Sequence, residues 1–395
     1  KQADGRFYSF LDVTPALEEL KHQADSARGI AAPQRDRYQA AVLSLEDRIN
    51  VYQSLKNTLQ PESTQDFPQE LQAYSAALAV GGKAIAQHSK SDSFDRGALE
   101  ALTLFFERYR FLEQAALLRP LAPLTNENQD NWKSVGTALL QTLNSSPLHP
   151  SIAAFALMSQ AHQRGDADVF NAALADYRQW LDTYWPASSK KAYWETLFND
   201  FEPFYKGILL YLLALVLAFA SWLVWTNSLQ RGALYLLMIA FGVHTLGLAF
   251  RMFLEGRPPV TNLYSSAIFV GWIAVLLSIV VERISRKGFG SIVGAVSGAL
   301  TLIIAHNLTG QGDTMEMMRS VLDYKFWLGT HVVTVTIGYS ATFLAVMLAH
   351  VYLLRGTLTP SLDKETAKEI TRMTYGVICF GLFFSFVGTV LGGIW

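Results

Sequence analysis

Two histidines lie within strongly apolar stretches, where an imidazole is costly unless it has a partner or a function. His244 stands near the middle of AFGVHTLGLAFRMFLEG, and His331 stands near the start of FWLGTHVVTVTIGYSATFLA. Ionisable side chains at membrane depth usually face protein or a cavity and mark functional sites. Neutral imidazole is also a common metal ligand. Both histidines are therefore candidate ligands; the alternatives are a hydrogen-bonded core histidine for the first and a solvated interface histidine for the second.

A cation follows His244 on nearly the same face of the predicted helix. Arg251 is seven residues further on, which is close to two helical turns. The loop GRPPVTNLYSS then supplies two prolines, Arg257, Asn262 and Tyr264. An imidazole with a cation placed further out along the helix suits an anionic ligand that contains a metal. A rigid re-entry turn with a capping side chain is the simpler alternative.

The other residues that could do chemistry give weaker signals. Trp327 lies one turn before His331, at the depth where aromatic belts form. His306 and His350 stand at helix ends and are interpreted as interfacial residues. We find no phosphate-binding Walker loop, dinucleotide fingerprint, HExxH motif or nucleophilic-hydrolase signature. No catalytic residue is therefore predicted, and whether the chain is an enzyme stays open.

Composition separates two unlike halves of the 395-residue chain, which is 51% hydrophobic overall. Residues 1–203 have an excess of Asp and Glu, whereas residues 204–395 are strongly apolar with an excess of Lys and Arg. Neither half has the concentrated basic patch that nucleic-acid binding requires. The single cysteine, Cys379, excludes a disulfide framework and a cysteine-type zinc site.

The elements that must position these residues are all helical. Residues 1–203 show apolar residues at three- and four-residue spacing and predict a soluble helical domain. Residues 204–395 contain about six apolar stretches, most of them near or above the roughly 20 residues needed to cross a bilayer. These stretches are 205–226, 232–254, 264–284, 288–308, 326–354 and 372–394. In the fourth, glycines recur every fourth residue from Gly290, which predicts close approach of another helix.

The basic residues of the short loops predict the orientation. The loops after the first, third and fifth stretches carry more Lys and Arg than those after the second and fourth. The first set should be cytoplasmic. We therefore expect a multi-pass protein of the bacterial cytoplasmic (inner) membrane, with the 1–203 domain and Trp395 on the extracytoplasmic side.

The membrane half resembles cytochrome c assembly proteins of the CcsA/ResC type, which belong to System II cytochrome c biogenesis. Three segments carry the resemblance: VHTLGLAFRMFLEGRPPVTNLYSSAIFVGW, FWLGTHVVTVTIGYSATFLA and VGTVLGGIW. It covers about 190 residues. It implies that haem b is held at an outer site and joined to apocytochrome c, in company with a ResB/CcsB-type subunit.

The resemblance also implies roles for individual residues. His331 matches an external histidine that binds haem iron, and His244 lies where many members have an intramembrane histidine. The remaining haem-contact predictions are Trp327, Arg251, Arg257, Asn262, Tyr264 and Trp395. The assignment of the arginines to haem propionates is inferred from charge alone. Two imidazoles would fill both axial positions of the iron, and the attacking thiolate would come from the apocytochrome.

The family's tryptophan-rich WGxxWxWD motif is expected just after Trp395, so we expect the chain to be a truncated piece that does not complete haem attachment. Two other functions stay open at this point. One is a transporter for a solute other than haem. The other is a scaffold or receptor that binds its partner through the acidic helical domain.

Overall fold

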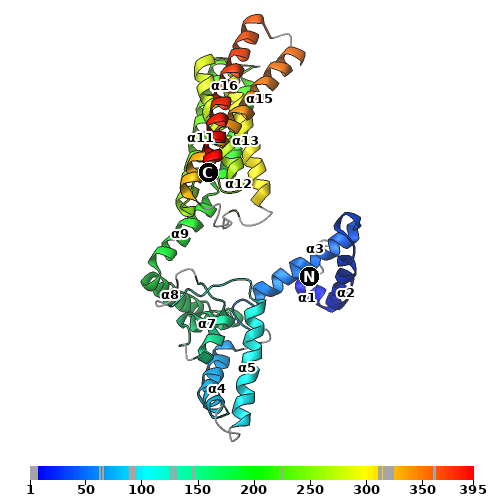
Figure 1. The fold of residues 1–395 in the computed structure, drawn as a ribbon, viewed down its shortest axis with the longest axis vertical. Helices are drawn as coiled ribbons and strands as arrows, with labels where there is room; N and C mark the ends of the chain where they lie inside the picture. The colour runs from blue at the N-terminus through cyan, green and yellow to red at the C-terminus, as the bar shows by residue number, and fades with distance from the viewer. Residues whose placement is uncertain are drawn as a thin grey trace. The chain divides into compact units, whose positions relative to one another are not determined.

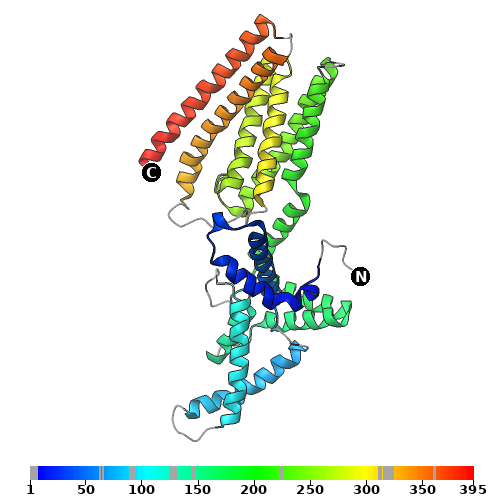
Figure 2. The ribbon, with the colours of Figure 1, turned by 90° about the vertical axis from the view of Figure 1, so that its right-hand side faces the viewer.

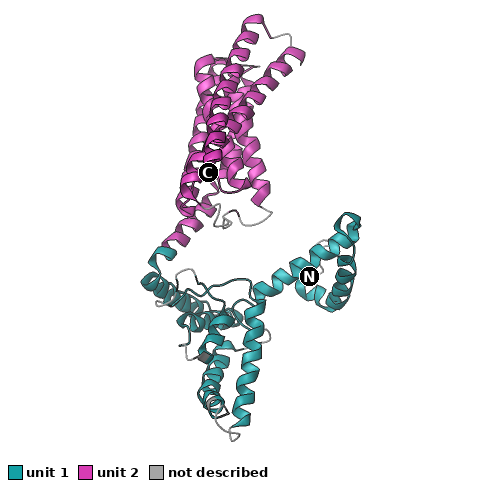
Figure 3. Ribbon diagram, viewed as in Figure 1, with its two compact units in different colours: residues 1–189 teal, residues 190–395 magenta. Residues whose placement is uncertain are grey.

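The computed structural model describes residues 8–61, 64, 66–88, 95–124, 128, 131–144, 147–222, 224, 226–309, 314, 324–358 and 362–395. These residues form helices and no strand; a single isolated bridge joins Leu121 and Lys133. The all-α prediction is thus confirmed. The chain divides into two compact units, Lys1–Ser189 and Lys190–Trp395 (Figure 3). This division falls 14 residues before the predicted domain boundary, inside a continuous helix.

The first unit is a set of amphipathic helices, drawn in blue to green in Figure 1. They are α1 (Phe10–Val13), α2 (Leu17–Arg28), α3 (Arg37–Lys56), α4 (Phe67–His88), α5 (Arg96–Ala115), α6 (Val135–Gln141), α7 (Pro150–Arg164) and α8 (Ala167–Tyr184). Helices α4 to α7 enclose a core that includes Tyr74, Tyr109 and Leu139. The Tyr74 hydroxyl donates a hydrogen bond of 2.9 Å to the Leu139 carbonyl, which joins α4 to α6.

The second unit is a helical bundle that begins within α9 (Pro186–Phe201). The other helices are α10 (Pro203–Ala220), α11 (Thr226–Glu255), α12 (Leu263–Ser285), α13 (Phe289–Thr309), α14 (Lys325–Trp327), α15 (Val333–Leu358) and α16 (Lys364–Ile394). Figures 1 and 2 show α10 to α13, α15 and α16 as one bundle, with α15 and α16 tilted away from the others in Figure 2. Within the described residues, six helical stretches are long and apolar enough to cross a membrane. The prediction of about six candidate membrane spans is confirmed.

Glycines lie at several close helix contacts in this bundle. A Cβ atom on Gly290 would lie 2.3 Å from the Ser278 carbonyl oxygen, and one on Gly294 would lie 2.1 Å from Ser278 Oγ. A Cβ on Gly298 would lie 2.8 Å from the Tyr211 ring. The glycine stripe therefore places α13 directly against α12 and α10, as its spacing predicts.

The bundle has two ends, which we name by a residue at each. The Trp395 end holds the starts of α10, α12 and α15 and the ends of α11, α13 and α16. The Lys287 end holds the opposite helix ends. At the Lys287 end, the buried Glu282 carboxylate accepts hydrogen bonds from the backbone N–H groups of Gly288 and Ser291, at 2.9 and 3.2 Å. These bonds satisfy N–H donors at the start of α13, as a helix cap does.

Candidate functional site

His331 lies on a π-helical turn, Leu328–Val332, that connects α14 to α15 at the Trp395 end. Its Nδ1 lies 2.7 Å from the carbonyl oxygen of Gly388 on α16. A carbonyl only accepts, so Nδ1 is the donor, and in the neutral ring this arrangement leaves the lone pair on Nε2. No other hydrogen bond to this ring occurs within the described residues. The ring is half-buried, and its Nε2 keeps a lone pair for an outside ligand.

Two indoles stand beside this imidazole. The rings of Trp327 and Trp395 are stacked, with centroids 6.4 Å apart and planes inclined by 12°. The Trp395 ring meets His331 edge-on at 5.7 Å. Trp395 is 44% exposed, so the cluster opens outward. The predicted contact residues Trp327, His331 and Trp395 are therefore brought together from the end of α14, the π-helical turn and the residue after α16.

Small residues make this arrangement possible. A Cβ on Gly388 would lie 2.4 Å from Val335 Cγ2, and a Cβ on Gly392 would lie 2.5 Å from Cε1 of His331. Only glycine at these two positions lets α16 pass close enough for the Gly388 carbonyl to reach the imidazole. The hydrogen bond and the glycines thus form one structural unit.

The loop after α11 lies next to the same turn. Gly256 ends α11 with φ of +63°, a conformation that glycine adopts at little cost. Asn262 then caps α12, because its side chain accepts from the Ser265 N–H at 2.9 Å while the Ser265 hydroxyl accepts from the Asn262 N–H. A Cβ on Gly329 would lie 3.8 Å from Pro258 Cγ, so the loop lies close to the turn that bears His331.

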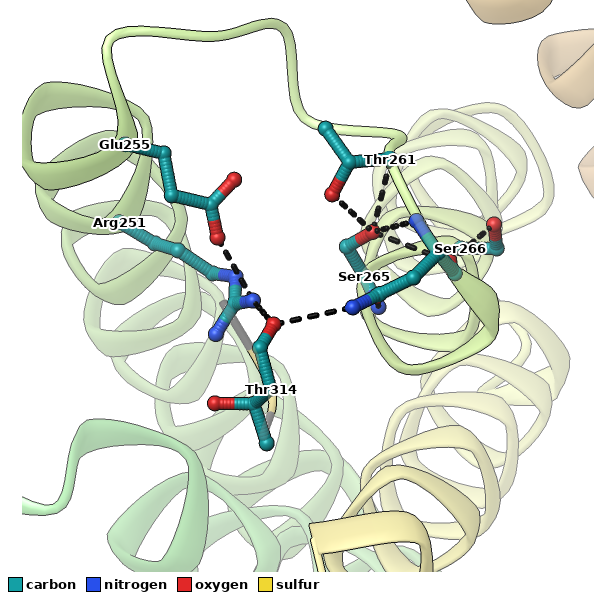
Figure 4. A network of polar contacts seen from close by, with 7 residues as sticks. Arg251, Glu255, Thr261, Ser265, Ser266 and Thr314 are labelled. Carbon is teal, nitrogen blue, oxygen red and sulfur yellow. Dashed lines mark hydrogen bonds and ion pairs between the residues drawn. The ribbon is translucent and has the colours of Figure 1, made fainter. Parts of the chain in front are cut away.

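Arg251 is buried in a network of polar contacts at this loop (Figure 4). Its Nη2 lies 2.6 Å from Oε1 of Glu255, whose side chain is also nearly buried. The same Nη2 donates a hydrogen bond to the Thr314 carbonyl. The same carbonyl accepts from Asn262 Nδ2 at 3.0 Å. The guanidinium lies 4.5 Å above the Tyr264 ring. Arg251 therefore has an internal counter-ion, and a propionate at this place would compete with Glu255.

Arg257 lies in the turn after α11 and is half-buried. It is thus close in the chain to the Arg251 network. Sequence reasoning singled out both arginines but overlooked Glu255, whose position four residues after Arg251 predicts an ion pair along the helix.

His244 is fully buried between α10, α11 and α12. Its Nε2 lies 3.2 Å from the Ile268 carbonyl oxygen and its Nδ1 lies 3.1 Å from the Tyr211 hydroxyl. The carbonyl requires a donor, so Nε2 carries the proton and Nδ1 accepts from the tyrosine. This geometry matches the alternative of a hydrogen-bonded core histidine. An iron ligand here would have to give up one of these bonds.

The comparisons with known proteins cover the same region. Residues 260–395 match the family model described as "Cytochrome C assembly protein". This part of the chain is therefore similar to cytochrome c assembly proteins. Within the matched residues lie Asn262, Tyr264, Trp327, His331 and Trp395, whereas His244 and both arginines precede them. The CcsA/ResC-type resemblance is thereby confirmed.

Individual relatives extend this picture. Protein NrfI of Wolinella succinogenes is 26% identical over 354 residues, which are 84% of this chain and 37% of that protein. Protein HemX of Bacillus subtilis is 24% identical over 195 residues, covering 48% of this chain and 70% of its own length. A cytochrome c biogenesis protein CcsA of Synechococcus sp. (strain CC9605) is 24% identical over 227 residues, covering 48% of this chain and 71% of that protein. Since the NrfI match covers 84% of this chain, it extends into the helical first half.

One pocket at the Trp395 end was not predicted. It has a volume of about 410 Å³ and is lined by residues of α9, α10, α12 and α13, including Glu202, Tyr264 and His306. Its residues are separated by up to about a hundred positions in the chain. The only sequence signals were a histidine at the end of an apolar stretch and the Glu202-Pro203 break before another.

Proposed function

We propose that this chain handles haem for cytochrome c assembly and presents it at the Trp395 end, with Nε2 of His331 as an axial ligand of the iron. The observation that carries the proposal is the hydrogen bond between His331 Nδ1 and the Gly388 carbonyl. Histidines that bind metals commonly donate their second ring N–H in this way, because the bond fixes the tautomer and the ring orientation.

The surroundings of His331 suit a flat apolar cargo. The stacked rings of Trp327 and Trp395 offer an aromatic wall beside the open nitrogen. Glycines at 388 and 392 keep the imidazole from being covered by side chains of α16. The site is half-exposed rather than enclosed, which suits a cargo that is later transferred to a protein.

The other residues act by position in this proposal. The Gly388 carbonyl keeps the proton on Nδ1, so Nε2 stays available. The indoles limit access of water to the ligand face. The Arg251 network holds the Pro258 loop against the π-helical turn. Arg257 and His244 remain predicted contacts, the first for a propionate and the second for a ligand site inside the bundle.

The proposed setting follows from the loop charges and from the family. Haem b is the proposed cargo and apocytochrome c the acceptor, and a CcsB-type subunit is the proposed partner. The Trp395 end and the first unit are placed on the extracytoplasmic side of a bacterial inner membrane. Because this chain spans 37% of the length of NrfI, covalent attachment is assigned to the complete assembly system rather than to these residues alone.

The test measures haem binding by the whole chain in lipid nanodiscs. The Soret band is titrated with haem for the wild type, His331→Ala and His350→Ala; His350 is an exposed histidine at the Lys287 end. We expect His331→Ala to weaken binding at least tenfold and added imidazole to restore it in part, whereas His350→Ala binds as the wild type does. Wild-type affinity and band position in His331→Ala would refute the ligand assignment.

A further inference from the structure

The unpredicted pocket at the Trp395 end has aromatic walls. Phe198 and Phe204 meet edge-on with centroids 6.0 Å apart, and Phe204 meets Tyr264 in the same way at 6.4 Å. The Tyr205 ring lies 5.8 Å from the imidazole of His306. These rings come from α9, α10, α12 and α13 and line one cavity of about 410 Å³. Its size lies within the range of roughly 300–1,000 Å³ that is usual for small-molecule sites.

Two polar side chains line this cavity without a protein partner in the described part of the chain. The His306 ring makes no hydrogen bond within the described residues, although its backbone carbonyl accepts from Thr309. The Glu202 carboxylate likewise has no ion pair or side-chain hydrogen bond among them. Both residues are exposed. The imidazole of His306 can donate and accept hydrogen bonds, and the Glu202 carboxylate can accept them. They are therefore available to hydroxyl or carbonyl oxygens of a ligand.

The backbone holds Glu202 in an unusual conformation. Its φ is +44°, in the left-handed region that is unfavourable for non-glycine residues. It precedes Pro203, which opens α10 and disfavours the right-handed helical conformation for the preceding residue. Such strain is often found at functional sites. Here it places a carboxylate at the cavity between α9 and α10.

Charge decides which class of ligand fits. The described lining includes a carboxylate but no lysine or arginine. A tetrapyrrole with two propionates or an anionic lipid would bring negative charge to a site whose described lining has a carboxylate and no lysine or arginine. A neutral aromatic ring whose oxygens donate or accept hydrogen bonds brings no negative charge to the pocket. The aromatic walls favour a planar group of this kind.

The position of the pocket indicates how the ligand arrives. It adjoins the first turns of α10 and α12, at the end of apolar helices that meet the criteria for membrane spans. Along α10, the side chains of Leu209, Leu213 and Val216 are each more than half exposed, as expected for a surface that faces lipid. A hydrophobic tail attached to the ring could lie on this surface.

We propose that this pocket binds the head group of a membrane quinone. The ring packs among Phe198, Phe204 and Tyr205. The imidazole of His306 hydrogen-bonds to one ring oxygen, and the Glu202 carboxylate accepts from a hydroxyl of the reduced form. This site is separate from the His331 site and does not depend on haem binding there.

Binding is measured with decylubiquinone and menadione on the haem-free full chain in detergent, by thermophoresis. We expect His306→Gln and Glu202→Gln each to weaken affinity about three- to tenfold, as for the loss of one net hydrogen bond. His350→Gln, the same substitution at the Lys287 end, should leave affinity unchanged. Glu202→Gly separates ligand binding from folding, because glycine adopts the positive φ without strain. This variant should unfold no more easily than the wild type, yet it should bind the two quinone probes more weakly.

Three outcomes would overturn the proposal. The first is that the wild type binds neither probe. The second is that a His306→Gln/Glu202→Gln double variant binds both probes as tightly as the wild type. A haem Soret band that is lost in His306→Gln would assign the pocket to a tetrapyrrole instead. Failure of the His331 site has a different signature, namely haem binding that is insensitive to His331→Ala while quinone binding persists.

Discussion

Replacing Gly392 by alanine adds one methyl group at the point where α16 passes the His331 ring. The new Cβ would lie 2.5 Å from Cε1, 3.0 Å from Nδ1 and 3.1 Å from Nε2 of that ring. These distances are too short for contact between carbon and ring atoms, so the imidazole must move. A Cβ on the neighbouring Gly393 would meet no heavy atom of the described residues within 4 Å, so Gly393→Ala is a matched control.

The expected magnitude follows from what the displaced ring loses. Movement away from α16 breaks the 2.7 Å bond between His331 Nδ1 and the Gly388 carbonyl. Loss of such an outer partner of a metal-binding histidine typically lowers metal affinity by about 10–100-fold. The backbone itself should gain from either substitution, because alanine is favoured over glycine in helices by roughly 0.5–1 kcal/mol. Reduced haem affinity with unimpaired helix formation is therefore expected for Gly392→Ala alone.

The assay is a haem titration in nanodiscs, followed at the Soret band, with circular dichroism to check helix content. Gly392→Ala should bind at least tenfold more weakly than the wild type, and Gly393→Ala should bind within a factor of about two. Equal affinities of the two variants would refute the reasoning, because the steric contact with the imidazole would then have no effect on the ligand site. A parallel loss in both would point to the helix end rather than to the ring.

Three further predictions test the scaffold. Gly294→Ala should destabilise the bundle by about 1–3 kcal/mol through overpacking against α12, seen as a lower Tm, whereas Gly242→Ala, which meets nothing within 4 Å among the described residues, should not. Arg251→Met should cost about 3–5 kcal/mol by leaving Glu255 buried and unpaired, and an added Glu255→Gln should recover part of this loss; no recovery would argue against the pair. Burial raises the pKa of Tyr109, so the folded state favours the neutral phenol. The contribution of the neutral phenol to folding stability is therefore complete below the ordinary tyrosine pKa of about 10, and it declines as pH rises above that value. Tyr109→Phe should reduce the alkaline loss of stability measured by urea unfolding between about pH 8 and 11, and an unchanged pH profile would contradict this.

Local properties of the sequence determined the helices and the apolar surroundings that they require. Apolar stretches of sufficient length predicted the six candidate spans, because a helix in lipid satisfies its own backbone and needs only apolar side chains. Spacing in the chain was enough to predict that another helix packs closely on the glycine stripe of α13, because Gly290 and Gly294 lie on one helix face. The alternative of a capping side chain in the loop after α11 is met by Asn262, and it could be weighed from the sequence because a cap bonds to a residue only three positions away.

Tertiary structure decided which ring nitrogen is open. His244 and His331 occupy similar apolar contexts in the sequence, but their partners lie on other helices. The Gly388 carbonyl is 57 positions from His331, and the Tyr211 hydroxyl is 33 positions from His244. No periodicity reports contacts of that range. The fully buried imidazole of His244 thus has both nitrogens hydrogen-bonded, whereas the imidazole of His331 keeps Nε2 available. The pocket between Glu202 and His306 could not be predicted from the sequence for the same reason, because helix packing alone brings its walls together.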